Sequence, residues 1–306
     1  MKKTLIALAA VAATGVAFAQ SSVTIYGKVN VSLTKANGSS AQMNDIHGSR
    51  LGFKVVEDLG GGLKANAQIE HRFTPDTGAQ SGDVMWNGLS TVGVSGGFGE
   101  IRLGRYYSAN FLGANNKPDP FGGDGQGALR GIGMRTVYVR TANVIHYSGK
   151  FSGVSVAAST GLKEGAEHAH NSIAVSYAAG ALDVGAGVDK GSDDGSVTNA
   201  YVTYDFGVVK LGAGLGNQKS PAGVKTKGFL VGATIPAGPG RVLVGFARAK
   251  VDGAADASNQ KIGLGYIYPL SKRTSLEATY GRDSKALVAG TTKKVGGVDF
   301  TLHHNF

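Results

Sequence analysis

Strict alternation of apolar and polar residues is the feature that most constrains this chain. In segment 23–31, VTIYGKVNV, the odd positions are apolar or glycine and the even positions are mostly polar. Segment 63–70, LKANAQIE, repeats the pattern, and further copies begin near residues 172, 210, 261, 275 and 298. Successive side chains of a β-strand point to opposite faces, so this period predicts strands with one apolar and one polar face. The chain is therefore predicted to be all-β.

Sixteen segments qualify as strands. They are 23–33, 50–57, 63–73, 89–95, 100–106, 143–149, 153–160, 172–178, 182–189, 197–206, 208–215, 228–235, 241–251, 259–268, 275–281 and 296–306. An even number of antiparallel strands, each long enough to cross a bilayer, is what a transmembrane β-barrel requires.

The connections between these segments alternate between short turns and long polar loops. The long ones are 34–49, 74–88, 107–142, 161–171, 190–196, 216–227, 252–258 and 282–295. A membrane barrel has short turns on its periplasmic side and long loops on its external side. A soluble β-sandwich, the alternative fold, has no reason to alternate its loop lengths in this way.

The first nineteen residues have the pattern of an export signal. Lys2 and Lys3 precede an apolar stretch, and Ala17-Phe18-Ala19 provides small residues at a cleavage site. We therefore predict a cleaved signal peptide at 1–19 and a single barrel domain at 20–306. Removing the two lysines with the signal lowers the formal charge from +10 to +8.

The composition suits a closed sheet better than an apolar core. The chain has no cysteine and 49 glycines, and its mean hydropathy is only −0.03. Lipid offers no hydrogen bonds, so a sheet that crosses it must pair every strand and close on itself. Such a barrel needs a moderately apolar outer face and a wet inner one.

Several motifs together resemble the general trimeric porins of Gram-negative outer membranes, a family of 16-stranded barrels. They are IYGK at 25–28, SRLGFK at 49–54, EDLGGGL at 57–63, GRY at 104–106, PDPFGGD at 118–124 and the terminal Phe306. The resemblance covers the whole chain after the signal. It implies a 16-stranded antiparallel transmembrane barrel with the third long loop, 107–142, folded into the lumen. It also implies a homotrimer, surrounded by outer-membrane lipid and lipopolysaccharide, that passes ions and small hydrophilic solutes.

The resemblance also assigns the residues of a pore constriction. Strand parity places Lys28 and Arg50 on the lumen side, and Arg105 and Arg140 flank the third long loop. These four match a basic ladder on the barrel wall of the family. Asp119 and Asp124 match acidic positions on the inserted loop that faces the wall. The excess of cations leads us to expect a preference for anions and anionic solutes.

Other chemistry is weakly indicated. Segment 212–217, GAGLGN, lacks the last glycine of a dinucleotide fingerprint and no predicted helix follows it. Glu167, His168 and His170 lie in a predicted external loop, so we interpret them as solvated. We predict no cofactor, no metal site, no nucleic-acid partner and no enzymatic activity. Two alternatives remain, a barrel hydrolase or protease and a plugged transporter, and single-channel conductance separates them from a diffusion channel.

Overall fold

The computed structural model describes residues 21–164, 169–253, 258–284 and 296–306. The predicted signal peptide and its cleavage site lie outside these ranges, as do Glu167 and His168. The interpretation of His170 as a solvated loop residue is wrong, because His170 is fully buried at the start of the strand His170–Ala179. Within the described ranges, no helix has both the length and the apolarity needed to span a membrane.

One antiparallel sheet contains all the described strands, and sixteen of them are long. The short ones, β2 (Gln42–Asn44) and β5 (Ala79–Gln80), belong to connections. The long ones are β1 (Ser22–Ala36), β3 (Arg50–Gly60), β4 (Leu63–Thr74), β6 (Ser90–Gly96), β7 (Gly99–Tyr107), β8 (Arg140–Phe151), β9 (Val154–Gly161), β10 (His170–Ala179), β11 (Leu182–Gly191), β12 (Gly195–Asp205), β13 (Lys210–Lys219), β14 (Lys225–Ala237), β15 (Gly240–Val251), β16 (Ser258–Pro269), β17 (Thr274–Asp283) and β18 (Gly296–Asn305). Each predicted strand is found, so the sixteen-stranded fold is confirmed.

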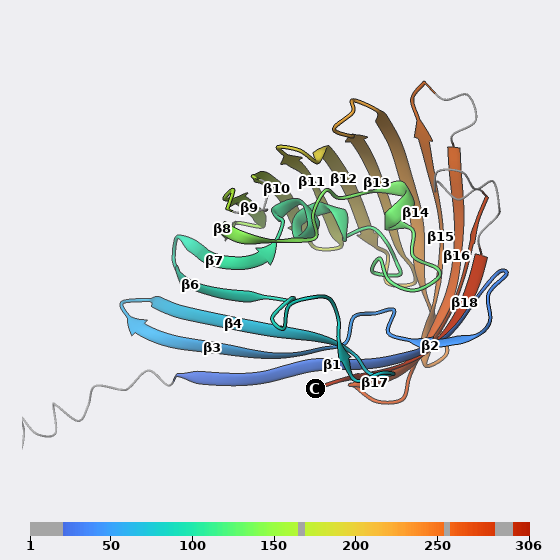
Figure 1. The fold of residues 1–306 in the computed structure, drawn as a ribbon, viewed down its shortest axis with the longest axis horizontal. Coiled ribbons are helices and arrows are strands. Elements are labelled where there is room, and N and C mark those ends of the chain that lie inside the picture. The colour runs from blue at the N-terminus through green and yellow to red at the C-terminus, as the bar shows by residue number, and fades with distance from the viewer. Residues whose placement is uncertain (1–20, 165–168, 254–257, 285–295) are drawn as a thin grey trace, which may run out of the picture.

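The sheet closes into a barrel between its first and last strands. β1 pairs with β3 on one side and with β18 on the other. Beyond the end of β18, the amide of Phe306 donates to the Gly27 carbonyl at 3.1 Å, and the amide of Gly27 donates to the Phe306 carbonyl at 3.0 Å. The wall curves round on itself in Figure 1. Closure satisfies the strand edges that would otherwise be exposed to lipid.

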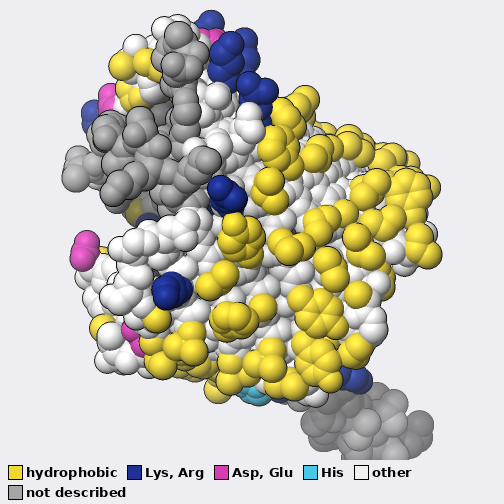
Figure 2. Space-filling view, turned by 90° about the vertical axis from the view of Figure 1, so that its right-hand side faces the viewer, with side chains coloured by type: hydrophobic (Ala, Val, Ile, Leu, Met, Phe, Trp, Pro, Cys, Tyr) yellow, Lys and Arg dark blue, Asp and Glu magenta, His cyan; other side chains and the backbone are white. Residues whose placement is uncertain are grey.

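The two faces of the wall differ as the alternation predicts. On β18, Phe300 and Leu302 are 60% and 49% exposed, whereas Asp299 and Thr301, which alternate with them, are buried. Figure 2 shows apolar side chains spread over the outer surface of the barrel, with Lys and Arg gathered towards one end. The outer face therefore has the apolar character that contact with lipid requires.

The connection between β7 and β8, residues 108–139, lies on the inner side of the wall (Figure 1) and is called the inserted loop here. It contains a π-helical turn, η1 (Phe111–Asn115), and a short helix, α2 (Arg130–Gly133). η1 contacts β9 to β12, and α2 contacts β13 to β16. Hydrogen bonds attach the loop to inward-facing side chains, from the Gln126 amide to Asp299 at 2.7 Å and from the Asn110 amide to Ser172 at 2.8 Å.

The apolar core lies between this loop and the wall. Leu129 and Met134 of the loop pack against Leu230 of β14 and Leu243 of β15, and all four are essentially inaccessible to solvent. The wall beneath is built from glycine, because a Cβ would collide with the loop at Gly212, Gly214, Gly228, Gly232, Gly245, Gly263 and Gly281. Seven of the 49 glycines thus lie on the part of the wall against which the inserted loop packs.

We predict that deleting Phe306 sharply lowers the yield of folded barrel, because both backbone hydrogen bonds at the seam and the ring over Gly27 are lost. Phe306→Ala keeps the backbone hydrogen bonds and should lower the yield less. Refolding into detergent, followed by the heat-dependent shift in gel mobility, measures the folded fraction. A normal yield for the deletion variant would contradict a role of this residue in closure.

Candidate functional site

A row of cations crosses the inner face of the wall, on the side opposite the strands β9 to β16 that the inserted loop contacts. The strand register places Lys28 of β1 beside Arg50 of β3, and Arg50 beside Arg72 of β4. Arg140, at the start of β8, continues the row through a shared contact with Tyr107. All four side chains are half-buried. We call Lys28, Arg50, Arg72 and Arg140 the basic row.

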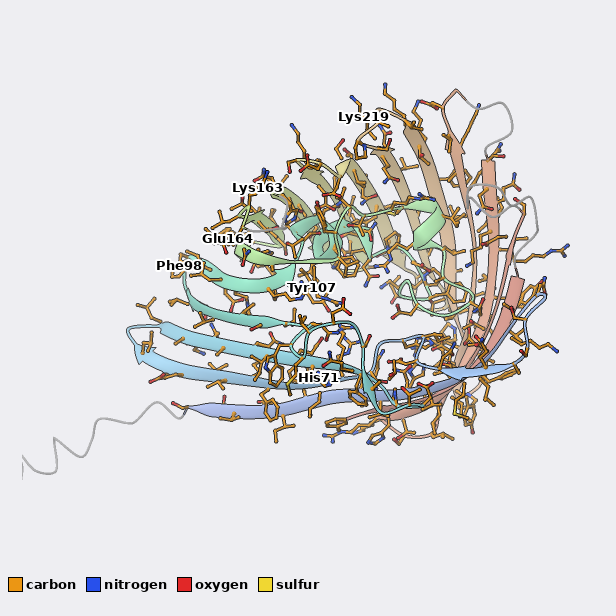
Figure 3. All side chains as sticks on the ribbon, viewed as in Figure 1. His71, Phe98, Tyr107, Lys163, Glu164 and Lys219 are labelled. Atoms are coloured by element: carbon orange, nitrogen blue, oxygen red, sulfur yellow. The ribbon has the colours of Figure 1, made fainter. Side chains whose placement is uncertain are left out.

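Neutral oxygens hold most of the guanidinium groups of the row. Arg50 donates from Nε to the Gly48 carbonyl at 3.1 Å. Arg72 and Arg140 each donate to the Tyr107 hydroxyl at 3.2 Å, and the Arg140 guanidinium lies 5.2 Å from the centre of the Tyr107 ring. Figure 3 shows Tyr107 on the inner side of the curved wall. These contacts orient the cations without neutralising them.

One carboxylate of the wall pairs with the row. Arg72 binds Glu70 Oε1, with Nη2 at 2.9 Å and Nε at 3.1 Å. Glu70 is only 3% exposed and also accepts a hydrogen bond from the Tyr26 hydroxyl at 3.2 Å. Like charges opposite one another on a sheet face repel, so Glu70 lowers the cost of placing Arg72 next to Arg50.

Arg105 is held at one side of the row. Its Nε donates to the Asn87 carbonyl at 3.0 Å, and the Asn87 side chain accepts from the Arg72 amide at 3.1 Å. A register shift between Gly104 and Tyr106 interrupts the strand parity here. The two hydrogen bonds of Asn87 connect Arg105 to Arg72 of the basic row.

Asp124, at the tip of the inserted loop, is the acidic side chain that faces the basic row. Burial raises the pKa of Asp124, while four cations act to lower it, namely Lys28, Arg130, Arg50 and Arg72. Three of these belong to the basic row. The fourth, Arg130, comes from the loop itself, where its guanidinium lies 4.8 Å from the centre of the Phe111 ring.

Asp119 has a different position from the one its charge suggested. It is 5% exposed, and its carboxylate accepts three backbone hydrogen bonds from Phe121, Leu129 and Arg130, at 3.0, 2.8 and 2.8 Å. Two of these amides begin the short helix α2. The carboxylate is thus directed into the loop, which it holds together, whereas Asp124 is directed at the wall.

Two charged residues of the site were not among the sequence candidates. Arg72 continues the polar even positions of β4 beyond Glu70, so strand parity could have identified it. Arg130 lies in a loop where no period applies, and only its approach to Asp124 and Asp119 reveals it.

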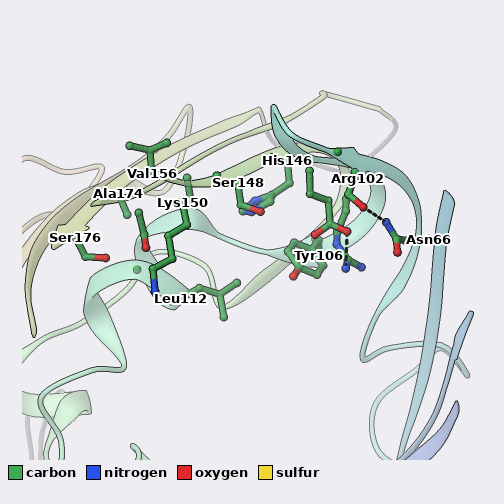
Figure 4. A pocket seen from close by; sticks show the side chains of 18 of the residues that line it. Asn66, Arg102, Tyr106, Leu112, His146, Ser148, Lys150, Val156, Ala174 and Ser176 are labelled. Carbon is green, nitrogen blue, oxygen red and sulfur yellow. Dashed lines mark hydrogen bonds and ion pairs between the residues drawn. The ribbon is translucent and has the colours of Figure 1, made fainter. Parts of the chain in front are cut away.

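A cavity of about 600 Å³ lies on the inner side, bordered by the short turns near Gly96, Gly99 and Gly149. Its lining includes Arg102 and Tyr106 (Figure 4), and Arg102 pairs with Glu100 at 2.9 Å. Three further cations line it, Lys54, Lys117 and Lys150. Lys117 approaches Asp183 at 3.4 Å. The turn side of the lumen is therefore rich in cations as well.

Comparisons with known proteins agree with this geometry. The profile of the family described as Gram-negative porin matches residues 4–285. Outer membrane porin protein 32 of Delftia acidovorans is 31% identical over the full length of both chains. The solved anion-selective porin from Comamonas acidovorans superposes with a TM-score of 0.82 at 26% identity, over 94% of this chain and all of the other. OmpT of Vibrio cholerae in its trimer form gives a TM-score of 0.71 at 17% identity, over 94% and 99% of the two chains.

We predict that Asp119 and Asp124 differ in their effect on the loop. Asp119→Asn replaces an acceptor oxygen by an amino group facing backbone donors, which costs about 1–2 kcal/mol and should increase loop opening roughly 5–30-fold. Asp124→Asn removes no backbone hydrogen bond that we observe and serves as the matched control. The rate of trypsin cleavage after Arg130 and Arg135 in the folded barrel, followed by mass spectrometry, measures opening. Equal rates in the two variants would show that Asp119 does not hold the loop.

Proposed function

The chain belongs to the Gram-negative porin family, and we propose that its channel prefers small anions because the basic row outnumbers the carboxylates that face it. Membership of the family identifies it as an outer-membrane porin channel and not an enzyme. The alternative of a barrel hydrolase or protease is thereby set aside.

The balance of charge at the narrow part of the lumen is the observation that carries the proposal. The basic row contributes four cations from the wall. Glu70 compensates Arg72, and Asp124 faces Lys28, Arg50 and Arg72 from the loop. Arg130 adds a cation on the loop side. Two further carboxylates act on these cations, Asp45 on Lys28 and Asp119 on Arg130. The five cations therefore exceed the four carboxylates that act on them.

Electrostatics turns this imbalance into selectivity. Charges in a confined aqueous gap raise the local concentration of ions of opposite sign. Salt screens charges over about 10 Å at 0.1 M, so only the groups nearest the gap act on a passing ion. Weak attraction is sufficient, because a channel must release what it admits. We expect a weak to moderate anion preference that is strongest at low salt.

The residue roles follow from the contacts. Lys28, Arg50, Arg72 and Arg140 act as the basic wall, and Asp124 acts as the opposing acidic group. Asp119 is proposed to shape the loop through its three backbone hydrogen bonds. Arg105 is proposed to support the wall through Asn87, with a smaller effect on ions than Arg50. The anion selectivity stated for the Comamonas acidovorans porin, which is 26% identical, supports this reading.

We further propose that the protein is a homotrimer whose apolar outer face contacts outer-membrane lipid and lipopolysaccharide. The exposed apolar band of Figure 2 supplies the surface for lipid and for neighbouring subunits. The fold shared with the OmpT trimer form is compatible with this assembly.

The trimer is tested by the molar mass of the purified protein in detergent. We expect light scattering coupled to gel filtration, corrected for bound detergent, to give the mass of three chains. Chemical cross-linking should give a ladder that ends at three. A single-chain mass in several mild detergents would contradict the proposal and leave the channel assignment untouched.

Selectivity is tested with the double variant Lys28→Gln and Arg50→Gln. Neither side chain lies within ion-pair distance of a carboxylate among the described residues, and Asp124, which both of them face, keeps Arg130 and Arg72 as compensating cations in the variant. We expect the chloride-to-potassium permeability ratio to fall at least about twofold, because the nearest charges decide selectivity. The zero-current potential of single channels in a KCl gradient measures it.

The control is Lys272→Gln, which changes an exposed lysine in the short turn between β16 and β17. Its zero-current potential should equal that of the wild type. A wild-type channel that prefers potassium over chloride, or a double variant with unchanged potential, would overturn the proposed role of the basic row.

A further inference from the structure

His47, Glu277 and His303 form a buried cluster that the channel mechanism does not use. His47 comes from the segment between β2 and β3, Glu277 from β17 and His303 from β18. The strand register explains how they meet. Asn30 of β1 lies opposite His303, and its side-chain oxygen accepts a hydrogen bond from the His47 amide at 3.3 Å. Asn30 thus holds the His47 segment over the end of β18.

The three side chains direct their metal-binding atoms at one point. His303 Nε2 lies 3.2 Å from one carboxylate oxygen of Glu277, and His47 Nε2 lies 3.9 Å from the other. One ligand atom from each residue lies within 4.8 Å of the other two. The residues are 6%, 7% and 8% exposed for His47, Glu277 and His303, so the cluster is almost closed to solvent.

Both imidazoles have an unsatisfied nitrogen at this point. Within the described part of the chain, neither His47 Nε2 nor His303 Nε2 makes a hydrogen bond, and the 3.2 Å approach of His303 to Glu277 lacks hydrogen-bond geometry. A buried polar atom without a partner costs about 1–3 kcal/mol. Two such atoms that face one carboxylate call for an explanation, and a bound ion would supply the missing partner of both.

We propose that His47, Glu277 and His303 bind a divalent transition-metal ion, with zinc as the representative. Two imidazole nitrogens and a carboxylate oxygen are ligands that zinc prefers, at about 2.0–2.2 Å. Tetrahedral geometry separates such ligands by about 3.4 Å, so small side-chain rotations bring the observed separations into range. Calcium and magnesium prefer oxygen ligands throughout, which this site does not offer. The fourth position is left for water.

The surroundings set the expected affinity. Asp299 interacts electrostatically with Glu277, and Asp45 interacts with His47, so both carboxylates favour a cation. Lys28 acts on His47 and Arg241 acts on Glu277, and both oppose a cation. Direct coordination must therefore supply most of the binding free energy. We expect a dissociation constant in the micromolar range.

The site lies next to the inserted loop and to Arg50 of the basic row. In the inserted loop, a Cβ added to Gly125 would lie 3.5 Å from the His47 ring. The His47 carbonyl accepts a hydrogen bond from Arg50 Nη2 at 3.5 Å. A bound zinc ion would place two positive charges beside the basic row and Asp124. This consequence for ion flow rests on the proposed function, whereas binding itself does not.

Calorimetric titration of Zn²⁺ into the folded barrel, in detergent and metal-free buffer, tests the site. We expect one ion per chain in the wild type. His47→Gln and His303→Gln should each weaken binding at least about tenfold. His304→Gln is the matched control. His304 follows His303 on β18 but is exposed on the outer face, so its substitution should leave the zinc affinity unchanged. The heat-dependent gel shift confirms that each variant is folded.

A second measurement keeps the proposal testable if a variant fails to fold. Zinc should raise the temperature at which the wild-type barrel unfolds, and magnesium at the same concentration should not, because a ligand that binds only the folded state stabilises it. Absence of saturable zinc binding in the wild type, or equal affinity in the wild type and both ligand variants, would overturn the proposal.

Discussion

Closure of the sheet through backbone hydrogen bonds is the constraint on which the rest of the structure depends. In lipid every amide and carbonyl must find a partner within the protein, so β1 has to pair with β18 as well as with β3. This requirement frees the side chains from building a central core. The inner face can therefore be polar, and the chain can combine a mean hydropathy near zero with a membrane location.

Closure of sixteen strands also leaves a wide space inside the barrel, and the inserted loop fills part of it. An empty sixteen-stranded barrel is a wide pore, and the loop reduces it by packing on β9 to β16. The wall accommodates this with glycine, since a Cβ at Gly214 or Gly245 would collide with Met134 or Leu129. On the other side of the loop, Lys28, Arg50 and Arg72 of β1, β3 and β4 interact electrostatically with Asp124. The inserted loop thus brings Asp124 to the charged part of the wall.

Two kinds of polar group lie close together here, one partly exposed and one buried. Neutral oxygens of Gly48 and Tyr107 orient the guanidinium groups of the basic row, and Glu70 compensates the charge of Arg72 alone within that row. His47, Glu277 and His303 are instead withdrawn from water, and their nitrogens lack partners. The first arrangement suits brief contact with passing ions, and the second suits retention of a single bound ion.

The sequence by itself determined the strands, their two faces and the channel class, because a period of two records which side of a sheet each residue occupies. Strand parity also assigns Lys28 and Arg50 to the polar face of their strands, and the same parity extends to Arg72, which the register sets beside Arg50. Only the tertiary structure decided the rest. Asp119 and Asp124 are five residues apart in a loop with no period, and contacts with amides and cations from other segments make one a support and the other a pore-facing charge. Likewise His47 meets His303 only because the sheet closes, which brings the two ends of the chain together.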